Sequence, residues 1–334
     1  MTRSIVLDEP GVWRLVTADP PEPGPGEALI RVVAAGVCGS DRDLYADTRP
    51  AGFAAYPVTP GHEWSGTVAA VGPGADPALV AAKVVGEGHR SCLTCDSCRN
   101  GDTNLCAKGY DETGFTSPGA FAEYLLLPAR LLHVLGDDAD LRAAALLEPA
   151  AVAAAGVRKV GPRPGESLAV IGAGTLGVLT LQLLGAYSPV ELVVVDPRRE
   201  RVEPALEAGA TAFRSPDEIG PLNGRFDAVV ETAGASGTAH AAVRLARRGG
   251  RVAILGIPGD PADSIPTTLI VTRHLALHTV FGSTSADWAH VVRAFAAGIL
   301  APAPFVTDEL PLEDYEQALK LSGSPTAGKI LLRP

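Results

Sequence analysis

The stretch Leu168-Ala-Val-Ile-Gly172-Ala-Gly174-Thr-Leu-Gly177 carries the clearest structural signal in the chain. An apolar run at Ser167–Ile171 predicts a buried strand, and the apolar residues 174–185 predict a buried helix. The glycines between them follow the pattern G-x-G-x-x-G. In this pattern one glycine permits a tight turn, one lets a pyrophosphate approach the backbone, and one lets the helix pack on the strand. We expect a dinucleotide site formed by Gly172, Ala173, Gly174, Thr175, Leu176 and Gly177.

The next strand, Glu191–Val195, ends in Asp196, an acid 19 residues after the last glycine of the motif. This is the distance expected for a carboxylate that binds the adenosine ribose. A carboxylate repels a 2′-phosphate and therefore favours NAD, but Arg198, Arg199 and Arg201 follow closely, and one of them could accommodate NADP. We expect NAD as the cofactor, with NADP as the alternative, and Asp196 and Arg201 among the cofactor-binding residues.

Strand and helix patterns alternate through this part of the chain. The pattern predicts helices at about 143–160, 198–208 and 236–247, and strands at Phe226–Glu231, at 251–255, near Ala212 and at about 275–281. Alternation at this length is typical of a parallel, doubly wound sheet. We therefore expect an α/β dinucleotide-binding domain over residues 148–286.

Residues 1–147 have a different character, because they are rich in Pro, Gly and short apolar runs. Segments 28–35, 66–71 and 122–127 have the composition of strands bounded by turn residues. This part is predicted to be mostly β with irregular loops. Residues 287–334 return to a helix and short strands.

Composition excludes several classes of protein. The 334 residues are 46% apolar and 20% charged, which suits about two globular domains. A net charge of −10 argues against a nucleic-acid-binding protein, which needs a basic face. We see no secretory signal, and the long uncharged run 167–190 contains four glycines and is better explained as strand plus helix than as a membrane span. We expect a cytoplasmic protein that binds neither nucleic acid nor membrane.

Four of the five cysteines are crowded together, at Cys92, Cys95, Cys98 and Cys106. Four thiolates at short spacing suit a tetrahedral zinc ion with no open position, which is a structural site. An iron–sulfur cluster uses the same ligands and is the main rival. The clustering, without a signal peptide, favours a reducing compartment and a metal over disulfides. We expect this zinc to order a lobe at about 88–108.

Three other segments carry chemically active residues: Cys38-Gly-Ser-Asp41, Gly61-His62-Glu63 and Glu148-Pro149. Each alone has an ordinary explanation, as a buried thiol, a turn histidine or a helix-capping acid. Together, one Cys, one His and one Glu form the mixed ligand set of an open, catalytic zinc site. The sequence does not show whether they meet in space.

The motifs occur in an order that resembles the zinc-dependent medium-chain alcohol and polyol dehydrogenases, along essentially the whole chain. The closing segments 311–318 and 327–329 also look like that family. The resemblance implies a GroES-like, β-rich catalytic domain built from both ends of the chain, 1–147 and 287–334. A Rossmann domain with a doubly wound parallel sheet is inserted between them. The Glu148-Pro149 form is similar to the sorbitol, threonine and glucose dehydrogenase branch.

The resemblance also implies the ligands of a catalytic zinc. Cys38 and His62 would hold the ion together with either Glu148 or Glu63, and the choice between the two acids stays open. Asp41 is expected to orient His62. With the four-cysteine lobe, this makes two zinc ions per chain.

A proton relay is implied as well, with Ser40 passing a proton from the substrate towards the cofactor. Many family members carry His five residues after the zinc cysteine, where this chain has Asp43. Either Asp43 carries the proton, or the relay exits through water.

The expected function is a zinc-dependent hydride transfer between a secondary alcohol (a polyol, sugar or aminocyclitol) and NAD. One alternative is an NADPH-dependent ketone reductase in a biosynthetic pathway. Another is a non-catalytic redox sensor or scaffold that binds zinc and nucleotide, which the intact set of Cys38, Ser40, His62 and Glu148 disfavours. The same residues disfavour a zinc-free quinone reductase. We expect a homodimer or homotetramer, because the last strand of the sheet would have an open edge.

Overall fold

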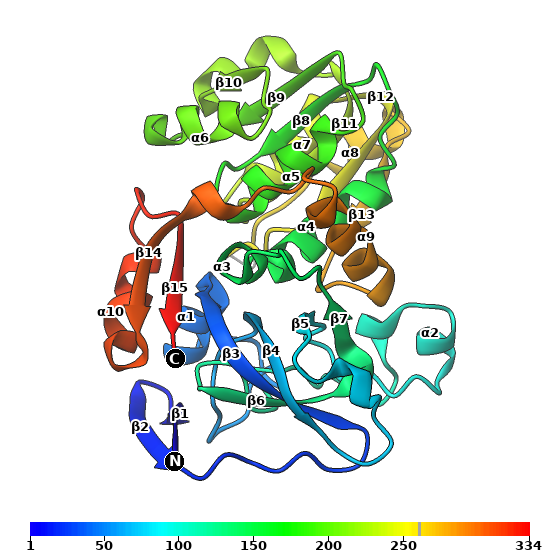
Figure 1. The fold of residues 1–334 in the computed structure, drawn as a ribbon. Coiled ribbons are helices and arrows are strands. Elements are labelled where there is room, and N and C mark those ends of the chain that lie inside the picture. Colours follow the sequence, from blue (N-terminus) through cyan, green and yellow to red (C-terminus); the bar gives the residue numbers. More distant parts are fainter. Residues whose placement is uncertain (260–261) are drawn as a thin grey trace. The chain divides into compact units, whose positions relative to one another are not determined.

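A computed structural model describes residues 1–259 and 262–334, which divide into two compact units (Figure 1). The first unit contains Met1–Glu148, Thr284–Ala296 and Pro302–Pro334, so it uses both ends of the chain. The second contains Pro149–Ser283 and Ala297–Ala301.

The second unit is built on six parallel strands. They are β8 (Ser167–Ile171), β9 (Glu191–Val195), β10 (Ala212–Arg214), β11 (Phe226–Glu231), β12 (Ala246–Ile254) and β13 (Ala276–Thr279). Their order in the sheet is β10-β9-β8-β11-β12-β13, which is the 3-2-1-4-5-6 order of the Rossmann fold. From β8, the strands β9 and β10 are added on one side of the sheet, and β11, β12 and β13 are added on the other. Ligands of such sheets bind at this switch point, between β8 and β11.

The central strands of this sheet are apolar along nearly their whole length. Four of the five residues of β8 and of β9 are buried. Near-continuous burial is expected where helices cover both faces of a parallel sheet. The predicted strands Ser167–Ile171, Glu191–Val195 and Phe226–Glu231 agree with β8, β9 and β11 residue for residue.

The helices of this part differ from the prediction at three places, one of which is a short helix at 267–272 that the pattern did not predict. The helices are α4 (Leu147–Val160), α5 (Thr175–Gly185), α6 (Val202–Glu207), α7 (Thr238–Leu245) and α8 (Thr267–Thr272). The predicted helix 143–160 is split into α3 (Leu141–Ala144) and α4, and the predicted helix 198–208 is split into η4 (Arg199–Arg201) and α6. Proline explains both breaks, because Pro149 and Pro204 lack an amide donor and fit only the first turn of a helix.

The first unit contains a seven-stranded sheet. Its strands are β3 (Glu27–Val37), β4 (Glu63–Val71), β5 (Lys83–Gly86), β6 (Tyr124–Pro128), β7 (Leu132–Val134), β14 (Val306–Pro311) and β15 (Lys329–Arg333). The order is β14-β15-β3-β4-β5-β7, with β6 also paired to β3. The C-terminal strand β15 lies antiparallel to β3, so residues from the two ends of the sequence become neighbours (Figure 1).

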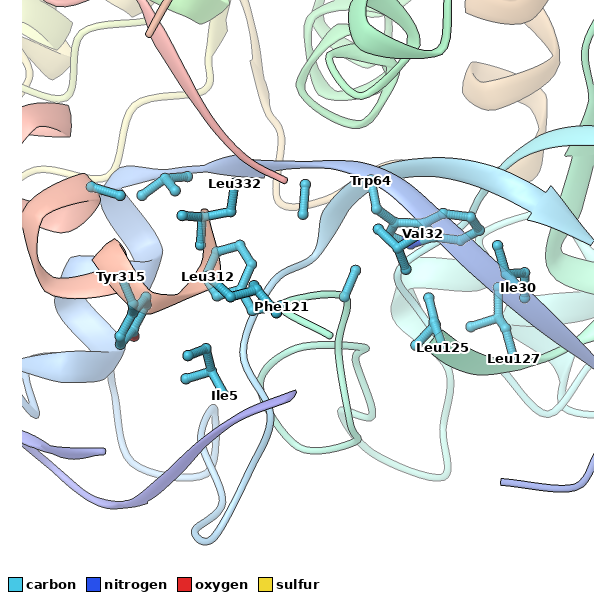
Figure 2. Packing of buried hydrophobic residues seen from close by; sticks show 14 of the residues in the cluster. Ile5, Ile30, Val32, Trp64, Phe121, Leu125, Leu127, Leu312, Tyr315 and Leu332 are labelled. Carbon is cyan, nitrogen blue, oxygen red and sulfur yellow. The ribbon is translucent and has the colours of Figure 1, made fainter. Parts of the chain in front are cut away.

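This unit also contains a hairpin of β1 (Thr2–Glu9) and β2 (Val12–Ala18). Its helices are α1 (Gly39–Tyr45), α2 (Asp96–Arg99), α3, α9 (Ser285–Ala296) and α10 (Tyr315–Ser322). Its core gathers side chains from distant parts of the sequence (Figure 2). Tyr315 at the start of α10 packs on Phe121 with ring centroids 5.6 Å apart. Among the described residues, we find no helix with the length and apolar character that crossing a membrane requires.

Candidate functional site

Cys38 lies where β3 ends and α1 begins. It is the N-cap of α1, and its backbone N–H donates to Oδ2 of Asp41 at 2.8 Å. Asp41 is completely buried, and its other oxygen, Oδ1, lies 3.4 Å from Nδ1 of His62. One carboxylate therefore caps the turn that carries the thiol and also faces the imidazole ring.

His62 directly precedes β4, which runs antiparallel to β3, so the start of β4 lies beside the end of β3. One ligand atom each of Cys38, His62 and Glu63 lies within 4.8 Å of the other two. The hydroxyl of Ser40 lies 3.4 Å from Nε2 of His62. Burial would lower the pKa of His62, but Asp41 and then Cys38 raise it well above its ordinary value. Asp41 and Cys38 therefore stabilise a positive charge at the position of His62.

Glu63 has a buried cationic partner. Its side chain is 0% exposed, and Nζ of Lys329, 4% exposed, donates to both carboxylate oxygens at 2.7 and 2.6 Å. Lys329 begins β15, which pairs with β3, so its side chain reaches past β3 to β4. Gly36 of β3 makes this possible, because a Cβ there would overlap the Glu63 carboxylate. Nζ also donates to the carbonyl of Val37 at 3.2 Å.

Glu148 occupies the first turn of α4 and is partly buried. Burial raises the pKa of its carboxyl group to about 8; His62 lowers it, and Glu63 and Glu112 raise it further. Glu148 therefore interacts electrostatically with His62 and Glu63 of the cluster. A carboxylate oxygen of Glu63 lies within 4.8 Å of the ligand atoms of Cys38 and His62. Glu148 is the further acid near this cluster, and a bound cation would favour its ionised form.

The donor set fits zinc. A thiolate, an imidazole and a carboxylate are the ligands of open zinc sites. Nδ1 of His62 faces Asp41, the arrangement in which a carboxylate holds the proton on one ring nitrogen and leaves the lone pair of the other for a metal. Asp43, by contrast, lies on an exposed part of α1 and accepts a hydrogen bond from Thr48 at 3.2 Å.

A layer of aromatic and charged side chains next to His62 could not be recognised from motifs. The His62 ring packs against Phe115, with centroids 4.6 Å apart, and the guanidinium carbon of Arg49 lies 3.6 Å from the centroid of the same phenyl ring. Arg49 also donates to the hydroxyl of Tyr110 at 3.0 Å, and that hydroxyl donates to Glu112. These residues lie apart from one another in the sequence, outside the motifs described above.

The four-cysteine cluster is brought together as expected from the spacing. The sulfur atoms of four cysteines all lie within 4.8 Å of one another: Cys92, Cys95, Cys98 and Cys106. Backbone N–H groups point at the sulfurs, with Cys95 N–H donating to Cys92 Sγ and Ala107 N–H to Cys95 Sγ, both at 3.4 Å. Hydrogen bonds from Thr94 and from the backbone lower the pKa of the Cys92 thiol to about 5. Donors that stabilise a thiolate are expected at a metal site.

The glycine-rich turn has the geometry that the pattern predicts. Gly172 follows β8 with φ +100°, a conformation that favours glycine. A Cβ at Gly177 would overlap the carbonyl oxygen of Gly172, so α5 can approach the turn only with glycine there. Gly174 is the N-cap of α5, whose first N–H groups are the usual ligands of a phosphate.

Asp196 follows β9 and lies against this turn. Its Oδ2 accepts the backbone N–H of Ala173 at 2.8 Å, and Arg198 forms an ion pair with it at 2.7 Å. Burial would raise the pKa of Asp196, but the hydrogen bonds from Arg198 and Ala173 lower it. Arg201 is buried at the end of η4, so the arginine that pairs with Asp196 is Arg198.

Comparisons with known proteins agree with this architecture. Residues 24–137 match the alcohol dehydrogenase GroES-like domain, and residues 172–297 match the zinc-binding dehydrogenase family. The L-threonine 3-dehydrogenase of Coxiella burnetii (strain Dugway 5J108-111) is 30% identical over 334 residues, which cover 97% of this chain and 96% of that protein. The chain belongs to the zinc-dependent medium-chain dehydrogenases.

Solved structures of zinc dehydrogenases share the fold. A thermostable alcohol dehydrogenase from Pyrobaculum aerophilum, with cobalt and zinc bound, is 31% identical with a TM-score of 0.89 over 100% of this chain and 99% of that chain. A protein from Sinorhizobium meliloti 1021, described as a zinc-binding dehydrogenase and bound to NADP, is 28% identical with a TM-score of 0.93 over 100% and 99%. The expected fold class, a GroES-like domain with a Rossmann domain, is confirmed.

Proposed function

We propose that this dehydrogenase transfers a hydride between a secondary alcohol of the polyol, sugar or aminocyclitol class and NAD, with NADP as the alternative acceptor. The observation that carries the proposal is the cluster of Cys38, His62 and Glu63, in which the histidine and the glutamate are buried, with Glu148 as a nearby acid. A mixed sulfur, nitrogen and oxygen set with an open position is the arrangement of catalytic zinc.

Two zinc ions per chain follow from this proposal. Cys38, His62 and one of Glu63 or Glu148 would hold the catalytic ion, and the four cysteines of the lobe would hold the structural ion. Zinc in the first site supplies Lewis-acid chemistry, because it lowers the pKa of an alcohol hydroxyl and polarises a carbonyl. The lobe site has four protein ligands and no open position, so it orders the loop and takes no part in the reaction.

The surrounding side chains would prepare the site for this chemistry. Asp41 keeps the proton of His62 on Nδ1, 3.4 Å away, so that Nε2 presents its lone pair. Lys329 balances the charge of Glu63. Its positive charge also favours the ionised form of Glu148, the nearby base or ligand. Ser40, 3.4 Å from Nε2 of His62, is placed to accept the proton of the substrate hydroxyl and pass it on.

The NADPH-dependent ketone reductase is the second candidate, because the same residues serve the reverse reaction. One observation favours it: Arg198 forms an ion pair with the acid that would otherwise repel a 2′-phosphate. The scaffold hypothesis has no comparable support, since the chain belongs to a family of dehydrogenases.

We also propose a homo-oligomer, dimer or tetramer, formed through β13. This strand is at the edge of the parallel sheet, and an edge strand offers unpaired backbone groups to a second copy. A cytoplasmic location is supported by the cysteines, which are all free of disulfides.

The experiment that tests the function measures initial rates of NADH and NADPH formation over a panel of polyols, aldoses, aminocyclitols, threonine and simple alcohols. We expect turnover on one substrate class, and we expect a zinc chelator to abolish it. Turnover that survives removal of the catalytic zinc would contradict the proposal. A protein that contains both zinc ions but forms neither NADH nor NADPH with any member of the panel would also contradict it.

A further inference from the structure

An arginine near the cluster of Cys38, His62 and Glu63 contacts the same aromatic ring as the imidazole. Arg49 lies in the loop between α1 and β4, and its guanidinium carbon is 3.6 Å from the centroid of Phe115. The ring of His62 packs on that phenyl ring with centroids 4.6 Å apart. All of these residues belong to the same structural unit. A ligand bound beside His62 would therefore have Arg49 within its reach.

The guanidinium group of Arg49 is held in a fixed orientation. Nε donates to the backbone carbonyl of Phe53 at 2.9 Å, and Nη2 donates to the hydroxyl of Tyr110 at 3.0 Å. A guanidinium group has five N–H donors, and these two bonds use none of those on Nη1. Within the residues that the structure describes, Nη1 of Arg49 has no hydrogen-bond partner, and it is not among the completely buried atoms that lack one. Nη1 is therefore open to solvent and to a ligand.

Arg49 has no acidic partner in the part of the chain that the structure describes. The chain has 38 acidic and 28 basic residues, and arginines elsewhere are paired with acids, such as Arg251 with Glu166 at 2.5 Å. The acid that the network reaches is Glu112, and the hydroxyl of Tyr110 lies between the two, accepting from Arg49 and donating to Glu112. A planar guanidinium group without a carboxylate partner suits a carboxylate or phosphate ligand, which it can bind through charge-assisted hydrogen bonds.

We propose that Arg49 binds an anionic group of the substrate, a phosphate or a carboxylate, so that the protein prefers polyols or sugars that carry such a group. This inference rests on the proposed function and narrows its substrate class. A hydroxyl group beside His62 and an anion at Arg49 would both lie near Phe115, so the anionic group is expected a few bonds from the carbinol carbon. Neutral polyols would be weaker ligands of the same site, because they offer no charged acceptor to Nη1.

The test compares three ligands with the same polyol chain: D-sorbitol, D-sorbitol 6-phosphate and D-gluconate. Their binding to the zinc-loaded full-length protein is measured by calorimetry without NAD or NADP, so that no turnover occurs. We expect the wild type to bind at least one of the two anions more tightly than sorbitol, and the anion that it prefers distinguishes phosphate from carboxylate. In Arg49→Gln, this preference should fall about ten- to a hundredfold, because charge-assisted hydrogen bonds are lost.

The matched control is Arg31→Gln, which removes an exposed arginine of β3 in the same unit and should leave the preference unchanged. A wild type that binds neither anion more tightly than sorbitol would overturn the inference. So would a preference that survives in Arg49→Gln, since the anion would then be bound by the metal ion and not by the arginine.

If the glutamine variant loses zinc or does not fold, Arg49→Lys replaces it. Lysine keeps the charge but loses the forked donors, so the preference should shrink, and an unchanged preference would count against the site. Turnover of neutral alcohols without tighter binding of the anions would refute this inference and leave the proposed reaction standing. Tighter binding of the anions that depends on Arg49, in a protein that oxidises no alcohol, would support the site and count against the reaction.

Discussion

Replacement of Lys329 by methionine tests whether the buried ion pair supports the catalytic unit. In the wild type, Nζ of Lys329 lies 2.7 and 2.6 Å from the two carboxylate oxygens of Glu63, and both side chains are almost fully buried. Methionine fills a similar volume but leaves the carboxylate without its cationic partner. An uncompensated buried charge of this kind costs about 3–5 kcal/mol of the free energy of unfolding.

Denaturant unfolding monitored by tryptophan fluorescence measures this loss in the structural unit that contains Lys329. The chain has three tryptophans, and all of them belong to the unit that contains Lys329; they are Trp13, Trp64 and Trp288. We expect Lys329→Met to lower the free energy of unfolding by about 3–5 kcal/mol, and the double variant Lys329→Met/Glu63→Leu to recover most of it, since an apolar pair of similar volume removes the unpaired charge.

The control is Lys320→Met, which breaks an exposed pair with Glu316 on α10. Those side chains are 76% and 49% exposed, and such pairs contribute only about 0.3–0.5 kcal/mol. If Lys329→Met costs no more than this control, or if the double variant is less stable than Lys329→Met, then Lys329 does not compensate the Glu63 charge and the reasoning is wrong.

Three further predictions concern other parts of the chain. Cys95→Ser should lower the zinc content from two ions to one per chain, by elemental analysis, without removing the ion at the catalytic cluster. Gly177→Ala should weaken NADH binding in a fluorescence titration and cost about 1–3 kcal/mol of stability, because its Cβ would overlap the carbonyl of Gly172; unchanged binding would contradict the packing argument. Burial would raise the pKa of Asp227, but hydrogen bonds, including one from Arg247 at 2.6 Å, lower it. Asp227→Asn should therefore cost about 1–2 kcal/mol by calorimetry above pH 4, with a cost that disappears as the pH falls through the lowered value; a pH-independent cost would refute this.

Much of the fold could be predicted because its signals are local. The apolar run Ser167–Ile171 and the glycines after it need only their neighbours to specify strand, turn and helix, and the structure agrees. The cysteine lobe was predictable for the same reason, since its four ligands lie within 15 residues of sequence. Pro149 and Pro204 lie inside helical patterns, and the pattern alone predicted one continuous helix where the structure has a break.

The parts that the sequence could not supply depend on residues far apart in the chain. Lys329 and Glu63 are 266 residues apart and meet only because β15 pairs with β3 and Gly36 leaves room between them. The arginine beside Asp196 posed a similar problem. Three arginines follow that acid, and only the backbone path into η4 shows that Arg198 pairs with it while Arg201 is buried.

The most direct test of the account measures zinc content, turnover and NADH binding together in Cys38→Ser, with Cys95→Ser as the matched cysteine control. We expect the wild type to hold two zinc ions per chain. Cys38→Ser should keep one zinc and normal NADH binding and lose turnover, whereas Cys95→Ser should lose the other zinc and retain turnover while it stays folded. A Cys38→Ser protein that turns over its alcohol with two zinc ions bound would contradict the assignment of the catalytic site.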